Sequence, residues 1–370
     1  MNPFEEANKT LDEFIENSLT EYHHLRNYDF GIENRSNVSQ ISKYTSHRIL
    51  NEYEIIEKLN DIDKRKKFTE EILWRIYWKG YLENHKSIWI KYKNFKDDSY
   101  DSNIFKAAKD GNTGIYCFDT WIEELRENNY LHNHTRIWFA SIWIFTLRLP
   151  WQLGARLFMR HLLDGDASSN TLSWRWVAGM HTNKKPYIAS KENINKYTVN
   201  RFTNTCFNLS KKINTIKYSQ DRLNTLPIRG IVSKSKILIM FDNDLNISNR
   251  SKLFDSYSKV YILSNGAKKN QFGISEKVSN FKQDLIENIS KLIPNSVILK
   301  SSDLEIFLTG FSCIDVIYPG IGNNLDLISE CVNKKQVIIN YIYLDKDLVY
   351  WEYAKSGFYK FKKSFYSINY

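Results

Sequence analysis

Two carboxylates, an amide and an arginine fall within one stretch of the chain. Asp164 and Asp166 flank a glycine, which predicts a turn that presents both carboxylates. Arg136 precedes the most apolar stretch and could pair with one of them, because a buried carboxylate needs such a partner. Asn170 adds a neutral amide, which both donates and accepts hydrogen bonds. On composition alone, the favoured interpretation is an acidic turn beside a Trp-rich core.

Four sequence segments around these residues follow one another in a particular order. They read LHNHTR over residues 131–136, LPWQLGAR over 149–156, LLDGDASSN over 162–170 and WRWVAG over 174–179. Upstream lie EEILWR over 70–75 and VSQISKY over 38–44. The set resembles the FAD-binding core of the DNA photolyase/cryptochrome family over roughly residues 25–200. Because four motifs match in order, the resemblance outweighs the interpretation as a plain acidic turn.

The resemblance implies non-covalent FAD and a role for each matching residue. Residues 39–42 would hold the phosphates, and Gln40 stands where the family usually has Arg. Arg136 and Asp164 would pair beside the isoalloxazine ring, Asp166 would bond its pyrimidine edge, and Asn170 would face flavin N5. The expected cofactor-binding residues are Ser39, Gln40, Ile41, Ser42, Arg75, Arg136, Asp164, Asp166 and Asn170.

A second set of residues matches the positions that photolyases of the cyclobutane-dimer type use against DNA. These enzymes flip the damaged bases out of the duplex, and the flipped bases stack on aromatic rings. Asn133 favours this type, since photolyases of the (6-4) type have His there, and His134 replaces a family Arg. The expected DNA-facing residues are Glu71, Trp74, Asn133, His134 and Trp176.

The family passes electrons to the flavin along a chain of Trp residues. Trp174 and Trp151 match its inner and middle members. No Trp lies at the spacing of the outer member, where Tyr100 or another aromatic residue could substitute. The expected catalytic residues are therefore Glu71, Trp151, Asn170 and Trp174.

Hydrophobic periodicity divides the chain into two parts. Helical spacing dominates the first part, over 48–59, 65–92, 118–127, 131–148 and 151–163. After Pro227, short apolar runs alternate with helical segments, which indicates a parallel sheet covered on both faces. We expect a mainly α FAD-binding domain of photolyase type over 1–204, a linker over 205–234, and a smaller α/β parallel-sheet (Rossmann-like) domain over 235–370.

The α/β part has predicted strands at 236–241, 259–263, 296–300, 315–318 and 336–341, with helices at 276–292, 303–309 and 323–332. Photolyases usually place an α/β antenna domain before the FAD domain, whereas here it follows. It could hold a second, antenna chromophore of unknown identity, or only brace the helical domain. We expect such a chromophore near residues 241–245 and 318–324, because ligands of open sheets bind beyond the carboxyl ends of the strands. We expect the helical domain to keep FAD without residues 235–370.

Charge and cysteine content limit the protein's class. The net charge of +10 permits a nucleic-acid partner without demonstrating one. The 4 Cys are too far apart for a CxxC pair, so we expect a cytoplasmic protein in a reducing environment. The His residues lack the spacing of a metal site, so we expect no bound metal. The N-terminus is not a signal peptide and no apolar stretch is long enough to span a bilayer, so we expect no membrane association.

Together these observations favour a light-dependent photolyase that splits cyclobutane pyrimidine dimers in DNA. The expected partner is damaged DNA, and the expected oligomeric state is a monomer. A cryptochrome-like blue-light sensor that binds FAD without repair is the first alternative. A flavoprotein or nucleic-acid-binding scaffold that does not respond to light is the second.

Overall fold

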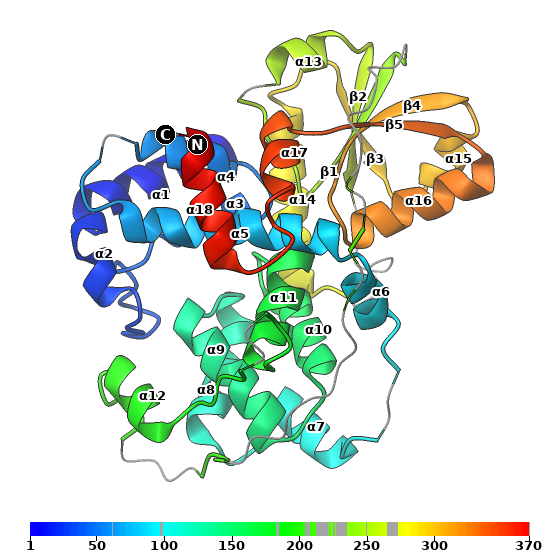
Figure 1. Cartoon of the computed structure of the whole chain (residues 1–370). Coiled ribbons are helices and arrows are strands. Elements are labelled where there is room, and N and C mark those ends of the chain that lie inside the picture. Colours follow the sequence, from blue (N-terminus) through cyan, green and yellow to red (C-terminus); the bar gives the residue numbers. More distant parts are fainter. Residues whose placement is uncertain are drawn as a thin grey trace.

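The chain forms a helical part followed by a parallel sheet, after which the C-terminus returns to the helices (Figure 1). The structure is a computed structural model. It describes residues 1–369 except 61, 97–98, 183–184, 204–207, 212–220, 222, 225, 227–234, 249 and 265–272. Most of the predicted linker over 205–234 therefore lies outside the described residues, and so does Cys206.

The first part is built from helices, as the periodicity predicted. Asn2 and Asn51 cap two of them through reciprocal bonds with the glutamate three residues on. The helices are α1 (Pro3–Asn17), α2 (Leu19–Leu25), α3 (Ser42–Thr45), α4 (Glu52–Lys58), α5 (Lys66–Asn84), α6 (Ser87–Lys93), α7 (Ser102–Asp110), α8 (Tyr116–Asn128), α9 (Asn133–Ser141), α10 (Trp151–His161), α11 (Ala167–Val177) and α12 (Lys191–Tyr197).

The predicted helix over 131–148 differs from the structure. Regular α-helix ends at Ser141, and a π-helical segment, η1 (Ile142–Thr146), continues it. The turn closes at Arg148, which has a positive φ of 55° and leads into Pro150. Here η1 is buried and carries Trp143, whose indole N–H donates to Pro150 O at 2.9 Å. The π-helical segment and the turn at Arg148 thus separate α9 from α10.

The sheet has five parallel strands in the order β3-β2-β1-β4-β5. The strands are β1 (Ile237–Phe241), β2 (Lys259–Ser264), β3 (Ser296–Lys300), β4 (Cys313–Ile317) and β5 (Ile338–Ile342). Parallel neighbours need crossover connections, which here include α13 (Ser251–Asp255), α14 (Glu276–Ser290), α15 (Leu304–Leu308) and α16 (Asn323–Lys335). All five predicted strands and the helices over 276–292, 303–309 and 323–332 are confirmed to within a few residues.

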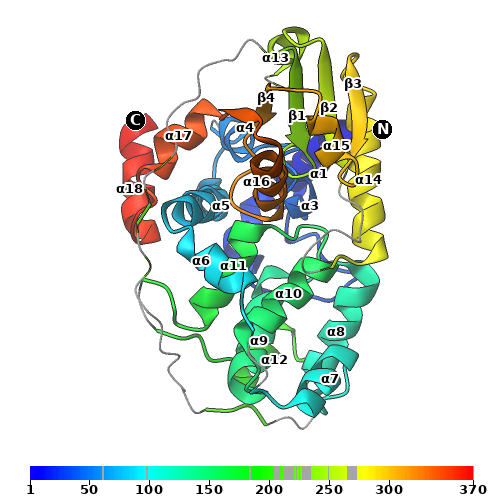
Figure 2. The same cartoon turned by 90° about the vertical axis from the view of Figure 1, so that its right-hand side faces the viewer.

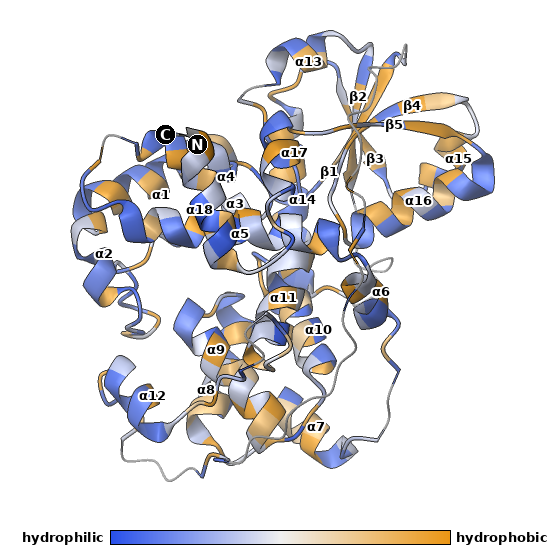
Figure 3. Ribbon diagram, in the orientation of Figure 1, coloured by the Kyte–Doolittle hydropathy of each residue, from blue (hydrophilic) through white to orange (hydrophobic). Residues whose placement is uncertain are grey.

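Alternate residues of β1 enter two different cores, as the period of two requires. Ile237, Ile239 and Phe241 join the core that contains α15 and α16. Leu238 and Met240 join the core that contains α14 and α1. Figure 2 shows α14 and α16 on opposite sides of the sheet, and Figure 3 shows the hydrophobic colouring along the central strands. Each core also includes residues of the helical part, so the two parts share their hydrophobic interior.

After β5 the chain leaves the sheet and packs on α5. The last helices are α17 (Asp345–Trp351) and α18 (Phe358–Asn369), and α18 lies across α5 in Figure 1. Gly80 permits this approach: a Cβ there would lie 2.7 Å from the Trp351 ring and 2.8 Å from Ala354 Cβ. Residues 345–369 were assigned to the α/β part, but they cover the helical part.

Candidate functional site

The predicted pair of Arg136 and Asp164 is present at the start of α9 and the turn after α10. Arg136 Nη2 donates to Asp164 Oδ2 at 2.9 Å, and Arg136 Nε donates to Leu131 O at 2.9 Å. Burial acts to raise the pKa of Asp164, but the Arg136 guanidinium outweighs it and the pKa lies below its usual value. The pair is therefore ionised and fixed in place.

Asp166 is the N-cap of α11. Its Oδ1 accepts from Ser169 N and from the Ser168 hydroxyl, both at 2.7 Å. Arg75, the cofactor-binding residue expected on α5, approaches Asp166 Oδ2 at 3.4 Å. Burial opposes ionisation, but Arg75 and Lys79 outweigh it and lower the pKa of Asp166. This carboxylate joins α5 to α11 and remains charged.

Asn170 lies one turn into α11, with its amide orientation set by the neighbouring helix. Its Nδ2 donates to Ala155 O on α10 at 2.8 Å, which fixes the direction of the carbonyl oxygen. Trp174 follows one turn later and is 2% exposed. Its ring lies over Gly154 of α10, where a side chain would collide with it. The GA pair of the LPWQLGAR segment therefore allows α10 and α11 to approach closely.

The loop over residues 39–42 lies beside the Arg136–Asp164 pair. Ser42 begins α3 and hydrogen-bonds Asp164, which helps to lower the pKa of that carboxyl. Ser39 is half-buried, Ile41 is buried in the core, and Gln40 is exposed with a positive φ of 52°. The loop and the carboxylates are thus brought together, although Ile41 can offer only its backbone.

Two of the expected DNA-facing residues stand on α5. Glu71 accepts from Arg26 Nη1 at 2.9 Å, yet burial raises its pKa above the usual value despite that arginine. Trp74 is half-buried, and the Phe358 ring of α18 stacks on it with centroids 3.7 Å apart and planes at 8°. One face of the Trp74 ring is therefore covered by the protein itself.

The other three expected DNA-facing residues lie on α9 and α11. Asn133 begins α9 and is exposed. His134 stacks on Trp138 at 4.1 Å, its Nδ1 lies 3.0 Å from Asn27 O, and burial lowers its pKa. Trp176 is half-buried, with its ring 6.1 Å from that of Tyr187. His134 is thus turned toward the protein, and burial favours its neutral form.

Trp151 has aromatic neighbours that could extend the expected electron chain. Trp151 stacks on Tyr92 with centroids 5.5 Å apart, and Tyr92 in turn contacts Trp89 at 5.5 Å. Tyr100, which was considered as the outer member of the electron chain, lies against Phe105 at 5.3 Å. Tyr92 is therefore a better placed neighbour of Trp151 than Tyr100.

Sequence reasoning missed the buried charges around Glu52. This carboxylate is 0% exposed and lies 3.0 Å from Arg75 Nε, 3.2 Å from Lys79 Nζ and 3.3 Å from Arg48 Nε. Burial acts to raise its pKa, but Lys79, Arg48 and Arg75 lower it to about 2. The four-residue spacing of Arg75 and Lys79 could have indicated one shared helical face. Arg48 and Glu52 are also four residues apart, but that spacing does not show that the pair is buried.

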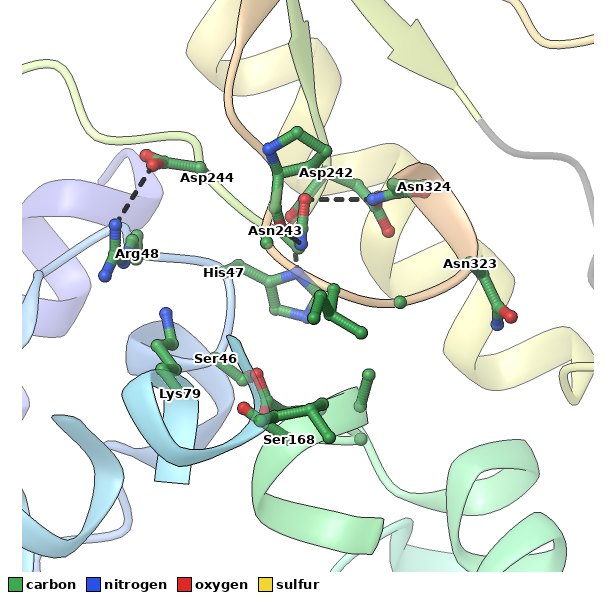
Figure 4. A pocket seen from close by; sticks show the side chains of 18 of the residues that line it. Ser46, His47, Arg48, Lys79, Ser168, Asp242, Asn243, Asp244, Asn323 and Asn324 are labelled. Atoms are coloured by element: carbon green, nitrogen blue, oxygen red, sulfur yellow. Dashed lines mark hydrogen bonds and ion pairs between the residues drawn. The ribbon is translucent and has the colours of Figure 1, made fainter. Parts of the chain in front are cut away.

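The carboxyl edge of the sheet meets the helical part at a small cavity of about 100 Å³ (Figure 4). Asp242 follows β1, and its Oδ1 accepts from Asn324 Nδ2 at 2.8 Å while its Oδ2 pairs with Lys282 at 2.8 Å. His47, from the helical part, joins the two parts directly, because its Nδ1 lies 2.6 Å from Asp242 O. This is the place expected for an antenna chromophore. The polar groups that line the cavity bond mainly to one another. Binding of an antenna chromophore there stays a prediction.

The described residues contain neither a membrane-spanning helix nor a cluster of metal ligands. No helix there is long and apolar enough to cross a membrane. In the same residues, no three His, Cys, Asp or Glu side chains gather in a way that could hold a metal ion.

Comparison with known proteins agrees with the geometry. A family model described as the FAD binding domain of DNA photolyase matches residues 68–212. A deoxyribodipyrimidine photo-lyase of Neurospora crassa is 29% identical over 196 residues, which cover 50% of this chain and 32% of that protein. The Escherichia coli photo-lyase is 28% identical over 191 residues, covering 48% of this chain and 39% of that protein.

Two solved structures are also similar to part of this chain. A class III photolyase from Agrobacterium tumefaciens is 25% identical, with a TM-score of 0.43 and coverage of 52% of this chain and 42% of that one. A Synechocystis cryptochrome is 20% identical, with a TM-score of 0.48 and coverage of 54% and 44%. The chain spans between 32% and 44% of the length of these relatives. In residues 68–212 it carries an FAD-binding domain of the photolyase/cryptochrome family.

Proposed function

We propose that this protein splits cyclobutane pyrimidine dimers in DNA by light-driven electron transfer. The observation that carries the proposal is the cluster formed by Asp164, Asp166 and Asn170 with Arg136, beside an α5 helix that bears Glu71 and Trp74. The matches to photo-lyases from a fungus and from bacteria support it.

The residues present fit FAD. The Asn170 amide is held by Ala155 O, so its carbonyl oxygen has a fixed direction and can accept an N–H. The paired Arg136 guanidinium can lie beside a polar ring edge without bringing uncompensated charge into the interior. When bound, FAD supplies the redox chemistry, and the protein supplies binding, orientation and electrostatics.

Glu71 would bind the substrate by donating a hydrogen bond from its protonated carboxyl group. Burial raises the pKa of this carboxyl, so its protonated form is more populated than that of an exposed glutamate. A protonated carboxyl donates through one oxygen, and this donor can bond a pyrimidine carbonyl oxygen. Arg26, which already binds the Glu71 carboxylate at 2.9 Å, keeps the group oriented in the absence of DNA. Glu71 thus positions the lesion and stabilises charge that develops on it.

The two tryptophans would hold the flipped bases by stacking. Phe358 covers one face of Trp74, so a pyrimidine would use the other face, with Trp176 as a second surface. Base–aromatic stacking contributes about 1–3 kcal/mol per base.

A repair assay tests the proposal. Holoprotein is mixed with dimer-containing single- or double-stranded DNA and a reductant, and dimer loss is followed under blue light and in the dark. We expect loss only under light, with Glu71→Gln retaining more activity than Glu71→Ala because an amide still donates. Absence of light-dependent loss on both DNA forms would contradict the proposal.

The same assay addresses a second candidate, a blue-light sensor without repair activity. The observation that favours it is the contact of Phe358 with Trp74, together with the inward position of His134 where the family has Arg. A sensor would bind FAD and respond to light without changing the dimer.

A further inference from the structure

A second, larger depression lies away from the flavin residues, between α4, the start of α5 and the C-terminal helices. Its volume is about 540 Å³. Arg65, Lys66 and Thr69 form the side that belongs to α5, and Lys346, Phe365 and Tyr366 form the side that belongs to α17 and α18. We call this depression the α5–α18 groove. Neither the family match nor the proposed function assigns it a ligand.

The α5–α18 groove carries a positive charge that the protein leaves largely uncompensated. Within the described parts of the chain, Arg65 and Lys66 form no ion pair, and both belong to the basic run Lys64-Arg65-Lys66-Lys67. Lys346 lies 3.9 Å from Glu57, but both side chains are more than half exposed. Such an exposed pair is worth little and separates easily. The groove therefore offers three cations against one weakly held carboxylate.

The N-terminus of α5 points to the same conclusion. The helix is 19 residues long, its N-cap is Arg65, no side chain caps it, and its first turn contains no acidic residue. The first N–H groups of a helix lack intrahelical partners and carry a partial positive charge, which favours an anion. Together with two adjacent basic side chains, this arrangement is suited to phosphate.

An independent observation comes from Thr69. Its side chain lines the groove, the residue is only 5% exposed, and its hydroxyl has no hydrogen-bond partner among the described residues. A buried hydroxyl without a partner is destabilising, so such groups are normally paired. A ligand oxygen in the groove would give this hydroxyl its partner.

We infer that the α5–α18 groove binds a small phosphomonoester attached to a flat ring, as in a nucleoside 5′-phosphate. Arg65, Lys66, Thr69 and the start of α5 bind the phosphate. The ring lies toward Tyr366 and Phe365, because aromatic side chains favour flat partners. The volume of the groove accommodates a ligand of this size.

Binding is measured by calorimetry on the FAD-loaded protein, so that an adenine nucleotide cannot enter the flavin site. The probes are AMP, inorganic phosphate and adenosine. We expect AMP to bind most tightly, phosphate more weakly, and adenosine at least about ten-fold more weakly than AMP, because it lacks the charge-assisted bonds. Equal binding of AMP and adenosine would overturn the inference.

Three variants locate the site. Thr69→Val keeps the shape and removes the hydroxyl, so we expect AMP affinity to fall about ten-fold while the free protein unfolds at the same or a higher urea concentration. Lys66→Gln is expected to weaken AMP binding by a similar factor. Lys252→Gln, an exposed lysine on α13, removes the same charge elsewhere and should leave affinity unchanged. A Thr69→Val protein that binds AMP normally would refute the assignment.

A DNA strand could supply phosphate to the same groups. An oligonucleotide without terminal phosphates distinguishes this source. We expect it not to compete with AMP for the groove at moderate salt. Competition that Thr69→Val abolishes would assign the groove to the DNA backbone and overturn the small-ligand inference. The flavin absorption of every variant should be unchanged, so the result does not depend on repair activity.

Discussion

Substituting Gly154 by alanine is a direct test of how α10 and α11 are held together. An ideal Cβ at Gly154 would lie 2.6 Å from Cζ3 and 2.9 Å from Cζ2 of Trp174, and closer still to Cη2. Carbon atoms in ordinary contact are about 3.5–4.0 Å apart. The Trp174 ring is 2% exposed and packs edge-on against Phe158 at 5.1 Å, so it has no open side toward which to move.

The magnitude follows from two opposing effects. Overpacking a well-filled core costs about 1–3 kcal/mol. Replacing a helical glycine by alanine in open space would instead gain about 0.5–1 kcal/mol. We therefore expect Gly154→Ala to lower the free energy of unfolding by about 1–2 kcal/mol, because the collision dominates. Since Asn170 lies on the displaced helix α11, FAD should also be released more readily.

Urea unfolding followed by fluorescence measures the stability change. Gly310→Ala is the matched control, because a Cβ there would meet only Phe307 O, at 3.7 Å. We expect the control to lie within about 0.5 kcal/mol of the parent protein. If Gly154→Ala also lay within that range, α10 and α11 would not be as closely packed as described, and the explanation of the GA pair would fail.

Three further predictions follow from buried groups. Asp347→Ala should cost about 3 kcal/mol, measured by urea unfolding, because it removes two bonds from the buried Arg48. Burial raises the pKa of Glu83 to about 7; the folded protein therefore binds the proton more tightly than the unfolded chain, and the free energy of unfolding should fall as pH rises from about 4.5 to 7. Glu83→Gln should flatten the pH dependence of the free energy of unfolding, measured by urea unfolding at several pH values. The same pH dependence in the variant and the parent protein would contradict this prediction. Trp74→Ala and Trp176→Ala should each weaken binding of dimer-containing DNA by about 1–3 kcal/mol, measured by titration. If both variants bind this DNA as tightly as the parent protein, neither tryptophan contacts the lesion.

Much of the flavin cluster could be predicted from sequence because its chemistry is local or matches ordered motifs. The turn from Asp164 to Asp166 and the pairing with Arg136 both appear in the structure. The strands were also predictable, since a buried parallel strand reads as a short run of apolar residues. Periodicity identifies which face of a helix or strand is buried, and this information was enough to predict the helices and strands themselves.

What the sequence could not predict is which elements meet across long separations. Nothing in the pattern of α18 indicated that Phe358 would stack on Trp74, because an apolar helical face can pack on many partners. Glu52 was missed because two of its three cationic neighbours, Arg75 and Lys79, lie on the separate helix α5. The π-helical segment after Ser141 depends on local packing, and its amino-acid composition does not distinguish it from an α-helix.

The contact between Arg48 and Asp347 has a consequence for biosynthesis. The two residues are 299 positions apart, and Arg48 is 5% exposed in the finished protein. Chains are synthesised at about 5–20 residues per second, so roughly 15–60 s pass between the two residues leaving the ribosome. During that interval Arg48 lacks its partner Asp347, and the last helices do not yet cover Trp74 and Gly80. Nascent chains should therefore depend on chaperones that shield exposed apolar surface until the last helices arrive, and a shortened C-terminus should be harmful out of proportion to its length.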